Sequence, residues 1–320
     1  MKKVLVIGAS GSLGKGVISE IKNQYKITGT YASRSFQEEG IRTQKLDITN
    51  PQDFKELEHN FDTVFLVAGA MPAMMEGYVP QQYIDVNVSG VLNVLEYCRK
   101  NDIKKIIYIM TFSDVAGSFY TGVPIQDNGP RALNLKGDHA VYSVTKVAAC
   151  DLIEHYHQEY GLQTIIFRIP TVYCNDDNFD YYVDGKLKAK AYVQMIRSIV
   201  NDHSVQVWGK PENAKDMPYI KDFASLVAKA IDHESAQGIF NAGTGQPVTL
   251  TELVDTMVAV FSPDNPVEKI CLPEKPSQPN FTFDMDRTKA TFSFEPQWSV
   301  KDMFYDIKNT LGIEAFKERT

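Results

Sequence analysis

The sequence has few cysteines and no long hydrophobic run, and both absences narrow the class of protein. Its 320 residues include four cysteines, Cys98, Cys150, Cys174 and Cys271, which lie far apart. No two of them have the spacing of metal ligands, so we expect reduced thiols and no metal site. Glycines interrupt the apolar run after Met1, and no stretch is long enough to span a bilayer. We therefore predict neither a signal peptide nor a membrane helix, and a cytoplasmic location.

Positive charge is also scarce. The formal net charge is -7 at pH 7, which argues against nucleic acid as the partner, because a phosphate backbone needs a basic face. Hydrophobic residues make up 43% of the chain and charged residues 23%, the balance of an ordinary globular protein with an ample core. We expect a small molecule as the partner.

The chain begins with a pattern typical of a nucleotide-binding turn. Residues 4–7 are apolar and predict a strand buried on both faces, and residues 15–22 have helical spacing. The glycines between them let the backbone approach a pyrophosphate, and the helix N-terminus offers unpaired N–H groups to it. The alternative is a tight turn without a ligand. The expected cofactor contacts in this turn are Gly8, Ser10, Gly11, Ser12, Leu13 and Gly14.

Strand and helix patterns then alternate through the first half of the chain. This predicts an α/β fold with a Rossmann-type, doubly wound parallel sheet over residues 1–173. Residues 174–320 change rhythm and predict a smaller C-terminal substrate-binding lobe, from which segments can return to the sheet. The predicted strands lie at 25–31, 42–46, 63–67, 105–110, 164–169, 204–208 and 238–242. The predicted helices lie at 51–58 (capped by Asn50), 83–100, 141–160, 191–200, 222–233, 250–261 and 302–311, with 175–185 and 263–279 irregular.

The end of the second strand bears on the choice of cofactor. An acidic side chain there would bind the ribose 2′-hydroxyl of NAD, but residues 31–35 contain none. Ser33 and Arg34 suit a 2′-phosphate, because a guanidinium binds phosphate as a fork. The sequence therefore favours NADP over NAD. The alternative is that Arg34 is a solvated loop residue and the cofactor is NAD.

Tyr142 and Lys146 stand one helical turn apart near the start of a long apolar helix. A lysine ammonium near a phenol lowers the phenol pKa, so the tyrosine can exchange a proton with an alcohol or carbonyl. Tyr182 and Lys186 have the same spacing but lie in a polar stretch broken by turn formers. We therefore predict that Tyr142 and Lys146 are catalytic.

With these residues in place, the sequence resembles the extended short-chain dehydrogenase/reductases of the NAD-dependent epimerase/dehydratase kind, which act largely on nucleotide sugars. The resemblance covers almost the whole chain and rests on the order and spacing of its motifs. Those motifs are the three glycines, Asp47-Ile48, residues 68–70, Asn87, Tyr142 with Lys146, and residues 168–173, 219–224, 240–243 and 286–290.

The resemblance implies roles for these residues. Tyr142 would be the acid/base, and Lys146 would also bind the nicotinamide ribose. The helices around Asn87 and after Tyr142 would form the interface of a homodimer. Further cofactor contacts implied by the resemblance are Asp47 and Ile48 at the adenine, and Ala68, Gly69, Ala70, Asn87, Ile169, Pro170 and Thr171.

The sequence also departs from the family pattern. The family has a serine or threonine pair after the fifth strand, and counting back from Gly117 places Phe112 at the catalytic position. A phenyl ring cannot donate a hydrogen bond, so either Thr111 or Ser113 would have to orient the substrate oxygen. Ala116 also replaces the usual aromatic residue.

The second lobe departs from the pattern as well. Lys215 and Lys275 stand where relatives that bind a diphosphate have arginines. Lysine holds phosphate as a point charge rather than as a fork, and each of the two can equally be a solvated surface residue. Together with Asn175, they are the expected substrate contacts.

These features predict an NAD(P)-dependent epimerase or dehydratase that acts on a sugar nucleotide, or a related hydroxyl or carbonyl compound, by hydride transfer. One alternative is an NADPH-dependent carbonyl reductase, which Arg34 favours. The alternative from another class is a non-catalytic NADP-binding regulator, which Phe112 suggests.

Overall fold

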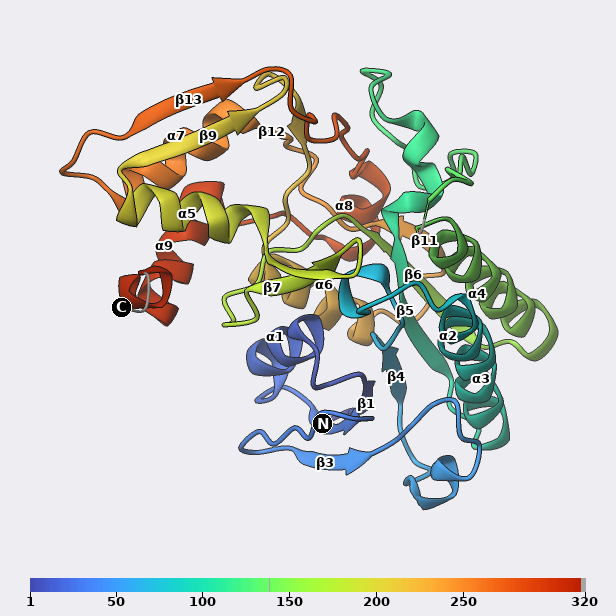
Figure 1. Ribbon diagram of the computed structural model, residues 1–320. Coiled ribbons are helices and arrows are strands. Elements are labelled where there is room, and N and C mark those ends of the chain that lie inside the picture. The colour runs from blue at the N-terminus through green and yellow to red at the C-terminus, as the bar shows by residue number, and fades with distance from the viewer. Residues whose placement is uncertain (138, 318–320) are drawn as a thin grey trace.

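Seven parallel strands form a central sheet in the order β11-β6-β5-β4-β1-β2-β3 in this computed structural model, which describes residues 1–137 and 139–317 (Figure 1). The strand order changes direction between β1 and β4. In such a sheet, ligands bind beyond the carboxyl ends of the strands near that change. The strands are β1 (Lys3–Ile7), β2 (Lys26–Tyr31), β3 (Arg42–Lys45), β4 (Thr63–Leu66), β5 (Lys105–Thr111), β6 (Gln163–Ile169) and β11 (Gly238–Asn241).

Helices cover both faces of this sheet, which explains why β4 and β5 are buried along their whole length. Val4 and Val6 pack with the face of α1 and α6, whereas Leu5 and Ile7 pack with the face of α3 and α4. The first pair of helices is α1 (Ser12–Ile21) and α6 (Ile220–Asp232). The second face carries α2 (Pro80–Ile84), a π-helical segment (Asp85–Gly90), α3 (Val91–Lys100) and α4 (His139–Tyr160) (Figure 1).

The second lobe lies above the carboxyl ends of the strands in Figure 1. It contains a parallel pair of strands, β9 (Ser204–Trp208) and β13 (Glu268–Leu272), with three helices packed near them. Two segments of this half, β11 and α6, belong to the central sheet and its helical layer. The helices of the lobe are α5 (Ala191–Asn201), α7 (Leu250–Phe261) and α9 (Val300–Leu311), and α8 (Asp286–Phe292) packs near β11.

Three expectations about local structure were wrong. Residues 51–58 form a 3-10 turn (Asp53–Glu56) rather than a helix, because Asp53 accepts a hydrogen bond from the backbone N–H of Asp47 (2.9 Å) and ties the turn to the end of β3. Residues 175–185 contain β7 (Asp180–Val183), which pairs with β8 (Lys186–Ala189) in a hairpin. Residues 263–279 contain β13. Strands β8 and β13 are largely exposed, so no hydrophobic pattern marks them.

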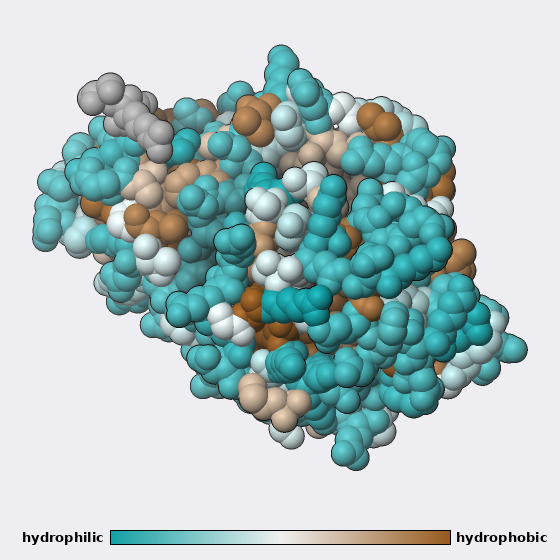
Figure 2. Space-filling view, turned by 90° about the horizontal axis from the view of Figure 1, so that it is seen from below, coloured by the Kyte–Doolittle hydropathy of each residue, from teal (hydrophilic) through white to brown (hydrophobic). Residues whose placement is uncertain are grey.

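Hydrophilic residues cover most of the face seen from below in Figure 2, and hydrophobic residues gather in one hollow near its middle. Within the described residues, no helix is both long and apolar enough to cross a membrane.

Gly16 allows α1 and α6 to pack closely. A Cβ at this position would lie 2.3 Å from Cγ1 of Ile220 on α6. We expect Gly16→Val to lower the free energy of unfolding by about 1–3 kcal/mol, because overpacking forces side chains and backbone to shift.

Urea unfolding would measure this effect. Gly77→Ala is the control, because no atom of the described residues other than its chain neighbours lies within 4 Å of a Cβ added there. Equal stabilities of the two variants would show that the close approach of α1 and α6 does not limit this position.

Candidate active site

The glycine turn at the end of β1 leaves no room for side chains. Gly8 has a φ of +98°, and a Cβ there would lie 2.6 Å from the backbone nitrogen of Ala68. A Cβ on Gly14 would lie 2.4 Å from the carbonyl oxygen of Gly8. Around Gly11, by contrast, the one atom within 4 Å of an added Cβ is the Gly8 oxygen, at 3.6 Å. Two glycines are therefore needed for packing, and the third leaves open space beside the turn.

The start of α1 presents free donors to this space. Gly11 is the N-cap and provides no side-chain cap, and the N–H of Lys15 donates to the carbonyl oxygen of Gly11 (2.8 Å). The N–H groups of Ser12, Leu13 and Gly14 precede that first helical bond and point out of the helix end. This arrangement suits the pyrophosphate of a dinucleotide. Ser10 lies in the same turn and is half-buried.

The ends of β2 and β3 form the next part of the groove. Ser33 and Arg34 are exposed, and Arg34 makes no ion pair within the described chain. The Asp47 Oδ1 atom accepts hydrogen bonds from the N–H and hydroxyl groups of Thr49 (2.9 and 2.8 Å). Ile48 is buried and lies so close to Gly90 that a Cβ there would be 2.7 Å from its Cγ1. Because the Arg34 guanidinium is exposed and has no ion-pair partner in the described chain, it is free to bind an anion.

Asn87 joins the loop after β4 to α4. Its Oδ1 accepts from the N–H of Ala70 (2.9 Å), and its Nδ2 donates to the carbonyl of Ala70 (2.9 Å) and to the hydroxyl of Thr145 (3.2 Å). Asn87 lies in the π-helical segment, a type of irregularity often found at functional sites. Both of its N–H donors are used within the protein. Asn87 therefore positions the loop of Ala68, Gly69 and Ala70.

The structure places Tyr142 beside Thr111, one of the two candidate hydroxyls. The Tyr142 phenol is hydrogen-bonded to Thr111. Thr111 Oγ1 in turn lies 2.6 Å from Ser113 Oγ. Thr111 also pairs in register with Ile169, so the strand end that leads to Pro170 and Thr171 lies beside it. Thr111 is thus the nearer of the two hydroxyls to the tyrosine, and Ser113 contacts Thr111, while the choice between them as the group that orients substrate stays a prediction.

Lys146 lies on the same helix, one turn beyond Tyr142. Its side chain is buried, with Nζ 4.1 Å from the centre of the Tyr108 ring and 3.7 Å from where a Cβ on Gly69 would stand. Burial lowers the pKa of Lys146 to about 8. Burial also raises the pKa of Tyr142, and the hydrogen bond with Thr111 opposes that rise. The expected net lowering of the Tyr142 pKa is therefore not found in this structure, because burial outweighs it.

Phe112 turns away from this group of hydroxyls. Its ring stacks on Phe119 and Phe281, with centroids 5.8 and 5.5 Å apart. The ring therefore fastens the loop after β5 to a segment of the second lobe.

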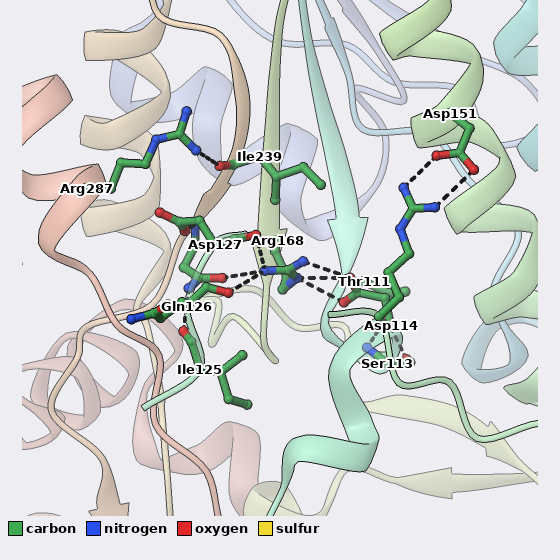
Figure 3. Close-up of polar contacts among 12 residues, drawn as sticks. Thr111, Ser113, Asp114, Ile125, Gln126, Asp127, Asp151, Arg168, Ile239 and Arg287 are labelled. Carbon is green, nitrogen blue, oxygen red and sulfur yellow. Dashed lines mark hydrogen bonds and ion pairs between the residues drawn. The ribbon is translucent and has the colours of Figure 1, made fainter. Parts of the chain in front are cut away.

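A buried ion pair fixes the same loop (Figure 3). Arg168 at the end of β6 donates through Nε and Nη2 to the Asp114 carboxylate, at 3.0 and 2.9 Å, and both side chains are at most 1% exposed. Its Nη1 donates to the carbonyl of Asp127 (3.1 Å) and to Oδ1 of Asn241 on β11 (3.0 Å). Burial raises the pKa of Asp114, and the bonds with Arg168 oppose that rise. The sequence marked Arg168 as part of a motif but gave no sign of its partner.

The predicted substrate residues are spread over the second lobe. The backbone of Lys215 forms an isolated β-bridge with that of Phe281, so Lys215 lies near the rings stacked on Phe112. Lys275 lies elsewhere, with its Nζ 5.6 Å from the centre of the Trp208 ring. Asn175 donates to Asp306 Oδ2 (3.1 Å). No contact found in the described chain joins these three residues.

Trp208 was not predicted, although an exposed tryptophan at the end of a short strand is a usable signal. Its side chain is 44% exposed. A further unpredicted residue is Asn178, whose Nδ2 lies 3.1 Å from the hydroxyl of Ser12 at the start of α1. The second lobe therefore contacts the glycine turn directly.

Tyr182 and Lys186 lie on the β7–β8 hairpin, so their helical spacing has no structural meaning. Tyr182 instead lines a cavity of about 300 Å³ with Met75 and Tyr83, and the Tyr83 ring lies 6.2 Å from that of Tyr142. In the part of the chain that the structure describes, no three histidine, cysteine, aspartate or glutamate side chains are grouped to hold a metal ion.

Comparison with known proteins identifies the class. The model of the NAD dependent epimerase/dehydratase family matches residues 4–243. The chain belongs to this family of enzymes. A UDP-glucuronate 4-epimerase from Thermodesulfobacterium geofontis is 24% identical, over 90% of this chain and 86% of that protein.

Solved structures share the fold. UDP-glucose 4-epimerase from Thermotoga maritima, solved with UDP-glucose, has a TM-score of 0.78 at 20% identity, covering 98% of each chain. RMD from Pseudomonas aeruginosa, solved with NADPH, has a TM-score of 0.75 at 16% identity, covering 97% of this chain and 99% of that one. The expected doubly wound parallel sheet and the resemblance to the NAD dependent epimerase/dehydratase family are thus confirmed.

The Arg168–Asp114 pair yields a test of what holds the site together. We expect Arg168→Met to lower the free energy of unfolding by about 3–5 kcal/mol, because it leaves the carboxylate buried without its partner. Without Arg168, the folded-state pKa of Asp114 rises further above its value in the unfolded chain. The folded variant then holds Asp114 in its neutral form, and it loses stability as the pH rises through that pKa. The difference in the free energy of unfolding between wild type and Arg168→Met should therefore grow from acid to neutral pH.

Unfolding by urea at pH 5 and pH 8 would measure this. Adding Asp114→Asn to Arg168→Met should remove the pH dependence and restore part of the stability. A deficit that is equal at both pH values would contradict the role given to the buried charge.

Proposed function

We propose that this enzyme transfers hydride between a bound nicotinamide cofactor and a hydroxyl or carbonyl carbon of a sugar nucleotide, or of a related compound. The observation that carries the proposal is the position of Tyr142 beside Thr111 at the end of β5, with Ser113 hydrogen-bonded to Thr111 and Lys146 one helical turn from Tyr142. A cofactor held by the glycine turn would supply the hydride acceptor.

Each residue has a distinct part in this proposal. Thr111 orients the substrate oxygen, and Ser113 holds the Thr111 hydroxyl. Tyr142 takes the proton from the substrate alcohol or returns it to the carbonyl. Lys146 would hold the ribose of a bound cofactor, and its positive charge would favour the phenolate form of Tyr142. An epimerase or dehydratase returns the hydride to the same molecule.

Arg34 supports NADP as the cofactor. Its guanidinium is exposed and unpaired in the described chain, and no acidic side chain follows β2 to hold a ribose 2′-hydroxyl. Structures that share the fold contain NAD in some cases and NADPH in another. An NADPH-dependent carbonyl reductase is the second candidate, because Arg34 favours NADP and a reductase releases the oxidised cofactor at each turnover.

The second lobe is proposed to hold the nucleotide part of the substrate. Lys215 and Lys275 supply positive charge, and Trp208 offers an exposed ring on which a base can stack. Asn175 is the third proposed contact. Several relatives and structural neighbours are named as UDP-sugar epimerases, which supports a nucleotide sugar as the substrate.

A homodimer is proposed on the outer face of α2, α3 and α4. Ile84, Leu92 and Val144 are 43%, 39% and 44% exposed on these helices. Three apolar side chains on neighbouring helices suit a second copy of the chain. A cytoplasmic location stays a prediction.

Tyr142→Phe tests the catalytic proposal. We expect kcat to fall by about 10²–10⁴-fold, because the variant loses proton transfer but keeps the ring. Cofactor affinity should change little. The measurement is turnover with UDP-glucose, UDP-N-acetylglucosamine and UDP-glucuronate, with either oxidised cofactor.

Tyr182→Phe is the matched control and should keep full activity. If the wild-type protein binds cofactor well but turns over neither these sugar nucleotides nor a panel of carbonyl compounds, the proposal of an enzyme fails. A non-catalytic NADP-binding regulator then takes its place.

Arg34→Ala tests the choice of cofactor. We expect affinity for NADP to fall by about 10–100-fold, because a charge-assisted hydrogen bond contributes about 1.5–3 kcal/mol. Affinity for NAD should stay the same, since NAD has no 2′-phosphate. Titration calorimetry with both cofactors measures this.

Arg42→Ala is the control, because Arg42 is also exposed but is paired with Glu58. Equal losses for both cofactors would contradict the role of Arg34. Stoichiometric NAD released from the purified protein on denaturation would also contradict it, and would favour a recycling epimerase.

A further inference from the structure

Tyr108 lies beneath the catalytic lysine. It is on β5, its side chain is fully buried, and its ring faces the ammonium of Lys146 at 4.1 Å from centroid to Nζ. Nζ also lies 3.7 Å from where a Cβ on Gly69, in the loop after β4, would stand. The ammonium is therefore close both to the ring and to a loop whose residues are predicted cofactor contacts.

The ring is the favourable electrostatic partner of this ammonium. Lys146 forms no ion pair with any carboxylate of the described chain, and its side chain is only 6% exposed. The negative face of an aromatic ring attracts a cation, and it does so more strongly where water is excluded. Such a contact favours the charged form of the lysine, against the effect of burial.

The other groups around Lys146 do not supply a negative charge. Cys150 follows one turn later on α4, and burial raises the pKa of its thiol to about 12, so it is neutral. Tyr142 precedes Lys146 by one turn, and burial raises its pKa as well. Asp114 is already paired with Arg168. Asn87, near the same loop, is uncharged.

The hydroxyl of Tyr108 does not account for a tyrosine at this position. Its oxygen is buried and has no hydrogen-bond partner within the described chain. A buried hydroxyl without a partner costs stability, so phenylalanine would serve packing at least as well. The ring face towards Lys146 is the contact that remains.

We propose that Tyr108 is a positioning residue for catalysis, whose ring keeps the ammonium of Lys146 charged and aimed at the loop of Gly69. This inference rests on the proposed function, in which Lys146 acts beside Tyr142. It assigns Tyr108 no contact with substrate or cofactor.

The test replaces Tyr108 with phenylalanine and with phenylalanines that carry one, two or three ring fluorines. Fluorine withdraws electron density from the face of the ring while leaving the shape of the ring almost unchanged. The pKa of Lys146 is read in cofactor-free protein by NMR of lysines labelled at the ε carbon, with the signal assigned by its loss in Lys146→Met. Melting temperatures establish that every variant is folded.

We expect the phenylalanine variant to keep the wild-type pKa of Lys146. Successive fluorines should lower that pKa stepwise, by about 0.5–1 in total, because the contact favours the charged form. Where turnover is measurable, kcat at neutral pH should fall along the same series while KM stays constant. Tyr108→Leu should resemble the trifluorinated variant.

A Lys146 pKa that does not change along the series overturns the proposal, whether or not the protein is active. A stepwise fall in the pKa supports it even if no substrate is turned over, in which case only the proposed function fails. The NMR measurement therefore separates the two.

Discussion

The rest of the site depends on the buried ion pair between Arg168 and Asp114. Arg168 leaves the end of β6, Asp114 follows β5, and Asn241 joins from β11, so three neighbouring strand ends meet at one guanidinium. A guanidinium presents its donors in a fixed plane, which sets the relative positions of its acceptors. Since Thr111 and Ser113 immediately precede Asp114, their positions beside Tyr142 follow from this pair. Burial makes the pair costly to break, so the loop has one well-defined arrangement.

Much of the fold could be predicted because the central strands are buried on both faces. Such strands are apolar along most of their length, as residues 4–7 and 106–110 are, and this signal survives without knowledge of the helices that cover them. The opposite holds for β8 and β13, which consist largely of exposed residues, several of them charged. Their backbones pair through hydrogen bonds that any sequence can make, so no pattern of side chains reveals them.

The candidate site was predictable in its positions but not in its contacts. The spacing of Tyr142 and Lys146 on one helix is local, and the glycine turn is local as well. Phe112 shows where local reasoning ends. Its place at the usual catalytic position follows from counting, yet its ring stacks on Phe281, which lies 169 residues further along the chain. That Thr111 rather than Ser113 lies next to Tyr142 also depends on the folded loop and could not be read from the spacing of the residues.

The hydrogen bond between Asn178 and Ser12 has a consequence for the lifetime of the bound complex. Asn178 belongs to the second lobe, whereas Ser12 opens the helix whose N-terminus faces the phosphate position. A dinucleotide bound at this helix end, as proposed, would lie beside a segment of the other lobe. Its residence time would then depend on how the two lobes separate as well as on how tightly the turn holds phosphate. A long residence time is what an enzyme needs if it is to hand the same hydride back to the molecule that gave it.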